Sequence, residues 1–467
     1  MAEAEADVAI IGAGVVGCAM ARRFALEGAT VAVLEAGSDI LSGASKANSA
    51  ILHTGFDAPP GSLELACMQA AYGEYMEIRG AMNLPVLETG AMVAAWTPGE
   101  EARLPDLLAQ AHENGVTDAE IIPREAVLAR EPNIAATVRA ALLVPREHLI
   151  DPWSAPLAYA TQAKMLGARF LFNAPLSFAE RRDGVWHLDA GGATVTARSV
   201  INCAGNQGDR IETLLLGASR FGIRPRKGQF VVFDKASGAL LRTILLPVPN
   251  DRTKGVVLTR TVFGNLLVGP TAEEQEDRER PDVTRPELDM LVAKAAELVP
   301  ALADMPVTAV YAGLRPATEK KEYRVHAEPD LGYYCAGGIR STGLTAALGI
   351  ARHVFALWDG AAEPPADPPV PVMPNLAEHL APRSVARPPV PAVRTRRRHS
   401  ARSWAPATGT AWHWPESARS GRMPAARRNA GRAGSDAMDS DPSAGNKGGR
   451  PRHFAVGHQV RSTGTQP

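Results

Sequence analysis

The residues with the clearest potential for chemistry form a glycine-rich loop near the N-terminus, Gly12-Ala13-Gly14-Val15-Val16-Gly17. An apolar run typical of a strand precedes this loop and a helical pattern follows it, which is the context of a dinucleotide-binding loop. Gly12 permits the tight turn, Gly14 lets the backbone approach a pyrophosphate, and Gly17 allows the helix to pack closely on the strand. Amide groups at the helix N-terminus donate hydrogen bonds to phosphates. We therefore predict that a nucleotide cofactor contacts Gly12, Gly14, Val15, Val16 and Gly17.

A carboxylate follows at the end of the next predicted strand. Glu35, with its neighbour Ala36, stands where a carboxylate can accept hydrogen bonds from both hydroxyls of an adenosine ribose. A 2′-phosphate would be repelled there, but the loop and the acid together do not separate FAD from NAD. The alternative interpretation is a glycine-rich turn followed by a surface acid.

Two further segments favour FAD. Residues 43–55 are small and polar, which suits a backbone that passes close to a large planar cofactor. Residues 337–344 repeat the strand, glycine turn and helix design, and the N-terminus of the new helix suits the electron-rich pyrimidine edge of a flavin. An ordinary strand-to-helix connection is the alternative for this second motif. We expect further cofactor contacts from Ser45, Lys46, Asn48, Ser49, His53, Ala204, Gly205, Gly338, Ile339, Ser341, Thr342, Gly343, Leu344 and Thr345.

A sheet has to bring these segments together. Residues 7–35 are typical of a β-α-β unit, and residues 195–204 are typical of a strand that returns to the same sheet. Residues 228–315 alternate strand-like runs with one helix, which suits a mostly antiparallel sheet. The pattern also predicts one charged helix near residues 100–114 and a closing helix near residues 344–358.

The predicted fold class is α/β, with a Rossmann-like FAD-binding domain and an inserted, mostly antiparallel β (α+β) substrate domain. A chain of 467 residues is long enough for two or three folded units. We predict that the FAD-binding domain comprises residues 5–83, 145–206 and 326–360, that the substrate domain comprises residues 84–144 and 207–325, and that residues 361–467 form a disordered tail rich in Pro and Arg.

The end of the chain differs in composition from the rest. Residues 381–467 contain 15 Arg, one Lys and four acidic residues, whereas the part before them is acidic. No Leu or Ile follows Leu380, so this segment cannot build a core. Three interpretations stay open: a disordered tail, an out-of-frame translation of a GC-rich gene, and an arm that binds nucleic acid. We predict no specific nucleic-acid partner.

The cysteines argue against several kinds of site. Cys18, Cys67, Cys203 and Cys335 lie far apart, with no C-x-x-C pair, which disfavours a zinc site, a local iron–sulfur site and a disulfide framework. We expect buried thiols, no metal and a reducing, cytoplasmic location. The acidic N-terminus lacks the features of a secretory signal. No stretch reaches the roughly 20 apolar residues of a membrane helix, so we expect peripheral membrane contact at most.

Several motifs resemble the FAD-dependent D-amino-acid-oxidase-like superfamily. They are VAIIGAGVVG, SKANSAILHTGFDA, GNLLVGPTA, AGLRPA and GGIRSTGLTA, and the resemblance covers about residues 5–360. Within the superfamily they resemble the branch of glycerol-3-phosphate dehydrogenases and L-2-hydroxyglutarate oxidases. The resemblance implies an enzyme that oxidises the CH–OH group of a small anionic substrate by hydride transfer to flavin. Such chains often continue into a cysteine-rich 2Fe-2S module, but no cysteine follows Cys335. The electron acceptor therefore stays open between oxygen, a quinone and a partner protein.

The resemblance also gives roles to three cations. It implies that Arg315 faces the substrate, where a planar guanidinium can hold a carboxylate or a phosphate through two hydrogen bonds. Lys321 begins a basic-acidic-tyrosine triplet like that of the glycerol-phosphate branch, and Arg340 lies beside the second glycine turn. We expect both to bind the substrate with Arg315. The alternative for Arg315 is a surface salt bridge, and the alternative for Lys321 and Arg340 is an exposed cation with no specific role.

A histidine is the candidate base. The resemblance places His53 near the flavin ring, where a neutral imidazole can accept the hydroxyl proton as hydride leaves the carbon. A structural histidine and a covalent link to the flavin are the alternatives, and His148 is a second candidate. Two other functions fit the same residues: oxidation of an amino acid or amine, whose carboxylate Arg315 would hold equally well, and a non-catalytic flavin-binding remnant.

Overall fold

In the computed structural model of this protein, the described residues are 3–249 and 255–360. They fall within one unit of the chain, residues 1–388. The tail predicted at residues 361–467 lies outside the described residues, and so do all three interpretations of it. The described helices include none that is long and apolar enough to cross a membrane.

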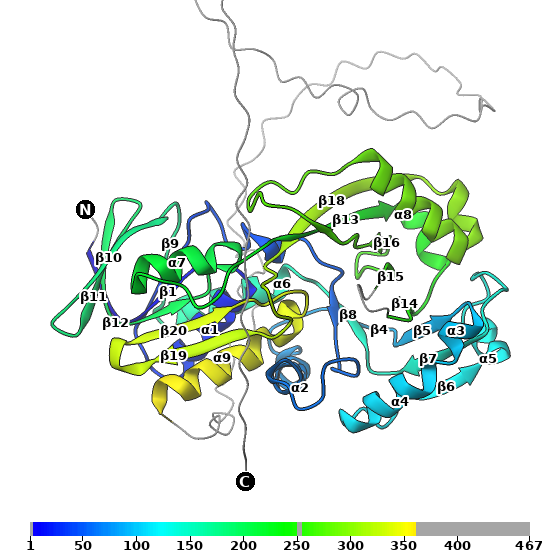
Figure 1. The fold of residues 1–467 in the computed structure, drawn as a ribbon, viewed down its shortest axis with the longest axis horizontal. Helices are drawn as coiled ribbons and strands as arrows, with labels where there is room; N and C mark the ends of the chain where they lie inside the picture. The colour runs from blue at the N-terminus through cyan, green and yellow to red at the C-terminus, as the bar shows by residue number, and fades with distance from the viewer. Residues whose placement is uncertain (1–2, 250–254, 361–467) are drawn as a thin grey trace, which may run out of the picture. The chain divides into compact units, whose positions relative to one another are not determined.

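One sheet has eight strands, and its centre is parallel (Figure 1). Strand β1 lies between β2 and β12 and is parallel to both, while β20 is parallel to the end of β12. The sheet is made of β1 Glu3–Ile11, β2 Val31–Leu34, β9 Arg169–Leu171, β10 Leu176–Arg182, β11 Val185–Ala190, β12 Ala193–Asn202, β19 Arg324–Glu328 and β20 Tyr333–Gly337. The predicted β-α-β unit and the predicted returning strand are therefore present.

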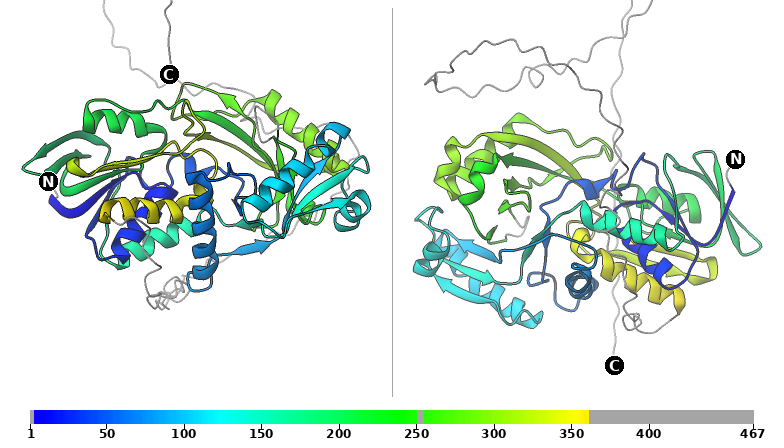
Figure 2. Two further views of the ribbon diagram at one scale, coloured as in Figure 1. Left: turned by 60° about the horizontal axis from the view of Figure 1, so that its bottom comes forward. Right: turned by 180° about the vertical axis from the view of Figure 1, so that it is seen from behind.

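Helices bury this sheet on both faces, as a parallel sheet requires. Alternate residues of β1 enter different cores: Val8 and Ile10 pack under α1 Val15–Leu26, whereas Ala9 and Ile11 belong to the core on the other face. Helices α1, α6 and α9 cover the first face, and α7 covers the second (Figures 1 and 2). The helices after α1 are α2 Leu63–Ile78, α3 Pro98–Glu101, α4 Leu104–Glu113, α5 Arg124–Arg130, α6 Ser154–Met165, α7 Gly208–Leu216, α8 Arg285–Leu298 and α9 Gly343–Asp359. The short 3-10 turns are η1 Ala44–Lys46, η2 Gly205–Gln207, η3 Lys235–Ala239, η4 Pro300–Asp304 and η5 Pro329–Leu331.

A buried polar network joins α1, α2 and α6. Arg22 donates to Glu74 at 2.5 Å and to Gln162 at 2.7 Å, and Arg23 donates to the second carboxylate oxygen of Glu74 at 3.2 Å. The side chains of Arg22 and Glu74 are only 2% and 6% exposed. A buried charge requires a partner, so this carboxylate fixes two arginines that would otherwise oppose the packing of the helices.

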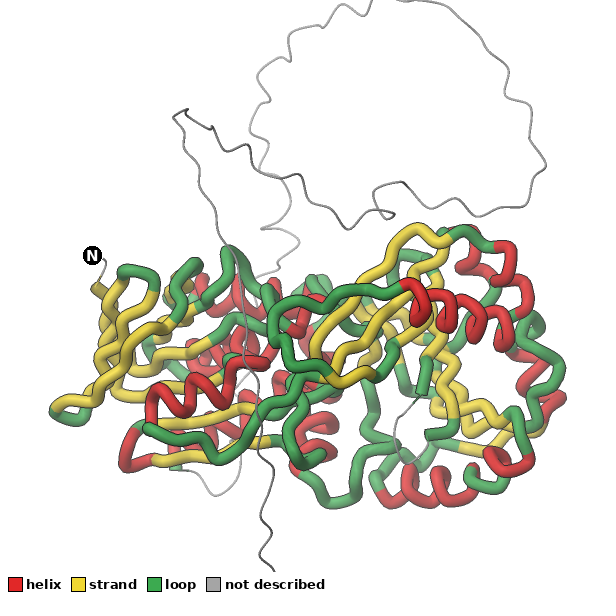
Figure 3. Tube along the Cα trace, turned by 45° about the horizontal axis from the view of Figure 1, so that its top comes forward, coloured by secondary structure: helices red, strands yellow, loops and turns green. Residues whose placement is uncertain are grey.

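The second large sheet has nine strands, most of them antiparallel, and α8 covers one of its faces (Figure 3). It consists of β5 Ala91–Ala95, β6 Glu120–Pro123, β7 Ala140–Val144, β13 Arg226–Phe233, β14 Ile244–Pro247, β15 Val257–Arg260, β16 Leu266–Gly269, β17 Glu273–Glu274 and β18 Val307–Arg315. A small sheet contains β3 Ile51–Leu52, β8 His148–Ile150 and β4 Val86–Glu88. This combination of sheets confirms the predicted α/β fold class.

Two local features differ from the sequence-based expectation. The helix predicted near residues 100–114 is two helices, α3 and α4, because Pro105 has no amide proton for the preceding turn and is accommodated only at the start of a new helix. The hairpin of β10 and β11 was not predicted. Its turn holds Asp183 and Gly184, both with positive φ, and this dipeptide is a signal for a tight hairpin.

We predict that Glu74→Gln lowers the free energy of unfolding by about 3–5 kcal/mol, because it leaves Arg22 buried without a carboxylate and Arg23 with Glu27 alone. Urea denaturation followed by circular dichroism measures this change. Glu88→Gln is the matched control, since Glu88 pairs with Arg79 on the surface and its side chain is 59% exposed. Equal unfolding midpoints for the two variants would contradict the prediction.

Candidate active site

The glycine-rich loop packs tightly between β1, α1 and the end of β12. Gly12 has a φ of +102°, and a Cβ on it would lie 2.7 Å from the Cys203 carbonyl oxygen. A Cβ on Gly17 would overlap the Gly12 carbonyl oxygen, so α1 can approach β1 only with glycine there. Gly14 is the N-cap of α1, and Val15 and Val16 form its first turn, which leaves their amides at the cofactor end of the helix.

Glu35 lies just beyond β2 at the same edge of the sheet. One carboxylate oxygen accepts a hydrogen bond from the Ala13 amide and the other from the Gly37 amide, each at 2.7 Å. A carboxylate has about four lone-pair positions, so each oxygen keeps capacity for a ribose hydroxyl. The geometry therefore fits the predicted role of Glu35, with the exposed Ala36 beside it.

Residues 43–55, the segment predicted to contact the flavin, contact the start of α1. The hydroxyl of Ser45 accepts a hydrogen bond from the Val15 amide at 3.0 Å. The side chain of Asn48 holds the turn, since its amide donates to the Ser45 carbonyl at 3.0 Å and its oxygen accepts from the Ala50 amide at 2.7 Å. Lys46 is exposed and Ser49 is half-buried.

Two more predicted segments reach the same edge, because β1, β12 and β20 are parallel and their carboxyl ends lie together. Ala204 and Gly205 follow β12, and Gly338, with a φ of +64°, follows β20. Between Gly338 and α9 lie the buried Ile339 and the exposed Ser341. The first residues of α9 are Gly343, Leu344 and Thr345.

Threonines near the start of α9 join it to distant parts of the site. The hydroxyl of Thr342 donates to Glu64 at 2.7 Å and lies 2.6 Å from the Tyr323 hydroxyl. The hydroxyl of Thr345 accepts from the His53 amide at 3.1 Å and donates to the Ile51 carbonyl at 3.1 Å. The second glycine turn and the segment that carries His53 are therefore fixed to each other.

A buried glutamate orients His53. The Nδ1 atom of His53 lies 2.8 Å from Glu147, whose fully buried carboxylate also accepts from the amide and the hydroxyl of Thr54 at 2.6 and 2.7 Å. An ionised carboxylate only accepts, so Nδ1 carries the proton, and Nε2 is the basic nitrogen of the ring in its neutral form. The sequence interpretation missed Glu147, although it is adjacent to His148.

His148 has a different setting. It lies in β8, with its backbone between Leu52 of β3 and Glu88 of β4. His148 is buried beside the ring of Tyr72, and this burial lowers the pKa of its imidazole. Its Nδ1 atom has no hydrogen-bond partner within the described part of the chain, whereas the Glu147 carboxylate holds Nδ1 of His53, and this favours His53 as the base.

Arg315 lies at the end of β18, among other arginines. It donates to the Thr271 carbonyl at 2.8 Å, and its guanidinium lies over Gly228 of the neighbouring strand β13. Burial, together with the nearby charges of Arg226 and Arg340, lowers the pKa of Arg315 to about 10. Within the described residues it has no carboxylate partner, so an anion would complete its charge balance.

Arg340 joins this cluster and Lys321 does not. Burial and the charge of Arg226 lower the pKa of Arg340, although Glu64 and Glu274 act in the opposite direction. Lys321 is exposed in the turn between β18 and β19. The third cation is therefore Arg226, which the sequence interpretation did not select.

Residues 7–357 match the family of FAD-dependent oxidoreductases. The chain belongs to this family. It is 33% identical to a glycerol 3-phosphate dehydrogenase of Caloramator mitchellensis, over 75% of this chain and 73% of the relative. It is 28% identical to a mitochondrial L-2-hydroxyglutarate dehydrogenase of Caenorhabditis elegans, over 57% and 63%. Its fold matches that of the reduced L-α-glycerophosphate oxidase of Mycoplasma pneumoniae with FAD bound, with a TM-score of 0.70, 26% identity and coverage of 76% and 95%.

The predicted cofactor and enzyme class are thus confirmed: this FAD-dependent oxidoreductase uses the family's cofactor. The residues present fit FAD. Gly12 and Gly17 leave no Cβ between the loop and α1, the start of α1 offers amides to the phosphates, and Glu35 stands at the ribose position. The individual cofactor contacts predicted from the sequence remain predictions.

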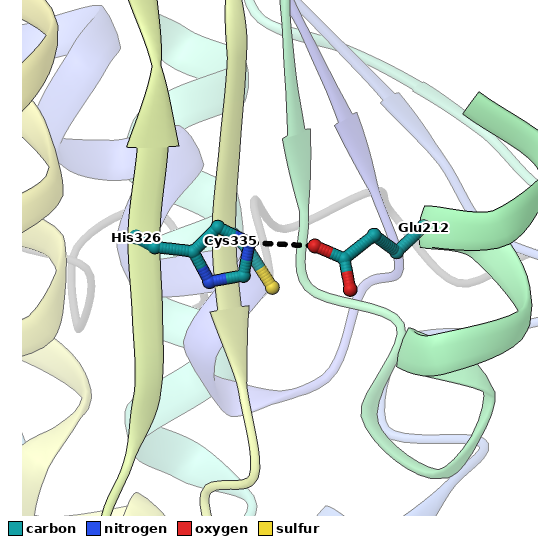
Figure 4. A group of neighbouring side chains, drawn as sticks. All are labelled: Glu212, His326 and Cys335. Carbon is teal, nitrogen blue, oxygen red and sulfur yellow. Dashed lines mark hydrogen bonds and ion pairs between the residues drawn. The ribbon is translucent and has the colours of Figure 1, made fainter. Parts of the chain in front are cut away.

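A second cluster, Glu212, His326 and Cys335, lies under α7 (Figure 4). Its possible ligand atoms lie within 4.8 Å of one another, and Glu212 is 2.5 Å from Nε2 of His326. Burial disfavours the Glu212 charge, but hydrogen bonds from His326, Ser219 and the Arg220 amide outweigh burial and lower its pKa. Burial raises the pKa of the Cys335 thiol to about 12, so the thiol is protonated. His326, Ser219 and the Arg220 amide satisfy the buried Glu212 carboxylate as a hydrogen-bonded core, and the thiol lies beside it.

We predict that Glu35→Arg weakens FAD binding about 30- to 1000-fold, because it replaces an acceptor of two hydroxyl hydrogen bonds by a cation. The flavin-to-protein absorbance ratio after dialysis, with identification of the nucleotide released on denaturation, measures the effect. Glu113→Arg, an equal charge reversal at an exposed position of α4, is the control. Release of a nicotinamide nucleotide from the parent protein would refute the assignment.

Proposed function

We propose that this enzyme oxidises a CH–OH group of a small anionic substrate, of the glycerol 3-phosphate or L-2-hydroxyglutarate type. The observation that carries the proposal is Arg315, a partly buried cation without a carboxylate partner among the described residues, beside the second glycine turn. The relatives named after these two substrates support the same class. When bound, FAD supplies a hydride acceptor.

Arg315 positions the substrate. Its planar guanidinium can donate two parallel hydrogen bonds to a carboxylate or phosphate, while one nitrogen keeps its bond to Thr271. Since Gly313, two residues earlier on β18, touches the segment that closes over α1, an anion on Arg315 lies near the flavin segment. Anchoring by two bonds fixes both the distance and the orientation of the reacting carbon.

His53 accepts the proton. As the C–H bond gives its hydrogen and both electrons to the cofactor, the O–H bond releases its proton to Nε2 of His53, and a carbonyl product forms. Glu147 holds Nδ1–H at 2.8 Å and stabilises the imidazolium that results. Glu147 is a positioning residue, because it acts through His53.

The four cysteines are buried and free, which is compatible with the reducing, cytoplasmic location that the sequence predicts. That location and the nature of the electron acceptor stay predictions.

The test of the proposal is anaerobic bleaching of the flavin. We expect glycerol 3-phosphate or L-2-hydroxyglutarate to bleach the bound flavin at least about 10-fold faster per unit concentration than L-lactate or glycine, since a further charge-assisted contact contributes roughly 1.5–3 kcal/mol. Stopped-flow absorbance measures the rates. Bleaching by amino acids alone would favour amine oxidation instead, and no bleaching by any compound would favour a non-catalytic flavoprotein.

We further predict that Glu147→Gln lowers kcat by about 10- to 100-fold and moves the acidic limb of the kcat/KM profile to lower pH. The sign follows because a neighbouring carboxylate favours the protonated imidazole, so its loss makes His53 a weaker base that stays neutral in more acidic solution. His148→Gln is the matched control and leaves the acidic limb in place. A shift of that limb in the control alone would assign the base to His148.

A further inference from the structure

Arg226, the first residue of β13, lies directly opposite Arg315 in the antiparallel pairing of β13 with β18. Residues directly opposite each other on neighbouring strands project to the same face of a sheet. The guanidinium of Arg315 lies over Gly228, which is two residues from Arg226 and therefore on that face. The two arginines thus share one face at one end of the strand pair.

That face is the one that meets the FAD-binding segment. Further along the same two strands, Gly228 stands opposite Gly313, and Phe230 stacks on Tyr311 with ring centroids 4.7 Å apart. The Tyr311 hydroxyl donates to the Asn48 carbonyl at 2.8 Å. Arg226 therefore projects toward the same region as the substrate anchor.

Charge makes this arrangement unusual. Like charges directly opposite each other destabilise a strand pair, and Arg226 raises the cost of charging both Arg315 and Arg340. Carboxylates offset these positive charges unevenly. Glu274 of β17 lies opposite Arg226 on the other edge of β13, and the charges of Glu64 and Glu274 favour the protonated form of Arg340. The causes that shift Arg315 include no carboxylate. With Glu64 and Glu274 counted, the three cations leave one net positive charge, which a bound anion would balance.

The geometry favours phosphate over carboxylate. A carboxylate has only two oxygens, so two guanidiniums share it with one oxygen each, as Arg22 and Arg23 share Glu74, and neither guanidinium then donates two parallel hydrogen bonds to it. A phosphate monoester presents three terminal oxygens and up to two charges, and it can accept from two guanidiniums at once.

We propose that Arg226 is a specificity-determining residue, which together with Arg315 binds the phosphate of a small phosphorylated alcohol. The proposal rests on the function proposed above and selects one of its two substrate types. In this arrangement Arg315 anchors every anionic substrate, whereas Arg226 contacts the third terminal oxygen that a phosphate has and a carboxylate lacks.

The experiment uses the full-length, FAD-loaded enzyme and two readouts. Inorganic phosphate is titrated while the flavin absorbance and the heat of binding are recorded, and kcat and KM are measured for glycerol 3-phosphate and L-2-hydroxyglutarate. We expect Arg226→Met to weaken phosphate binding and raise KM for glycerol 3-phosphate about 10- to 100-fold, with kcat changed less than about threefold. KM for L-2-hydroxyglutarate should change less than about threefold.

Arg224→Met is the matched control, because Arg224 is an exposed arginine two residues before Arg226. It removes the same charge and should change neither readout. If it weakened phosphate binding as much as Arg226→Met, the effect would be one of overall charge and the proposal would be overturned. Unchanged phosphate affinity in an Arg226→Met protein that retains FAD would also overturn it.

The phosphate titration distinguishes failure of the proposed function from failure of the proposed phosphate site. If no alcohol bleaches the flavin but Arg226→Met still loses phosphate binding, the proposed function fails and the phosphate site stands. If Arg226→Met loses FAD, Arg226→Lys provides the test: a point charge lacks the planar fork, so phosphate affinity below that of the parent supports the proposal and equal affinity overturns it.

Discussion

The active site depends on one close approach of two backbones, where β18 crosses the segment that follows the nucleotide loop. Gly313 makes it possible, since a Cβ there would lie 2.5 Å from the Cβ of Ala47. Tyr311 and Arg315 lie on the same face of the strand, one bonded to Asn48 and the other close to Arg340. Any side chain at position 313 would separate the nine-stranded sheet from the cofactor segment and move the substrate anchor away from it.

The buried arginines differ in whether a carboxylate neutralises their charge. Arg22 and Arg23 are deeply buried, but both are bound to Glu74, so their charge is balanced within the fold. Arg315 donates to a backbone carbonyl, and the charges that shift its pKa, those of Arg226 and Arg340, are positive. A fold does not gain stability from such a cluster, and the cluster is useful when an anionic substrate supplies the missing charge.

Two histidine–glutamate pairs show that position decides what the same chemistry does. The carboxylates of Glu147 and Glu212 are both fully buried, and each holds a histidine ring. His326 packs against Phe221 and Tyr333 under α7, where its bond to Glu212 ties a helix to the sheet. The amide of His53 is instead bonded to Thr345 at the start of α9, among the cofactor segments. One pair ties a helix to the sheet, and the other lies among the cofactor segments, where we propose that it transfers a proton.

The sequence by itself determined the features that depend on local geometry. The glycine spacing at residues 12–17, the apolar run before it and Glu35 identify a nucleotide site, because the steric need for glycine and the strand–turn–helix order are properties of consecutive residues. The second glycine turn at residues 337–344 is local in the same way. The α/β fold class followed from the alternation of these elements.

Only the tertiary structure decided which distant residues meet. Glu147 reaches His53 because β8 pairs with β3, and Arg226 faces Arg315 because β13 pairs with β18 in one register; a shift by one residue would turn Arg226 to the other face. Neither pairing leaves a mark in the sequence around these residues. Lys321 shows the reverse, since its neighbours in sequence suggested a substrate contact, but the turn after β18 leaves it exposed. Local sequence patterns specify loops, helices and strands. The packing of the whole sheet sets the strand register, and the register specifies which of the candidate catalytic residues meet.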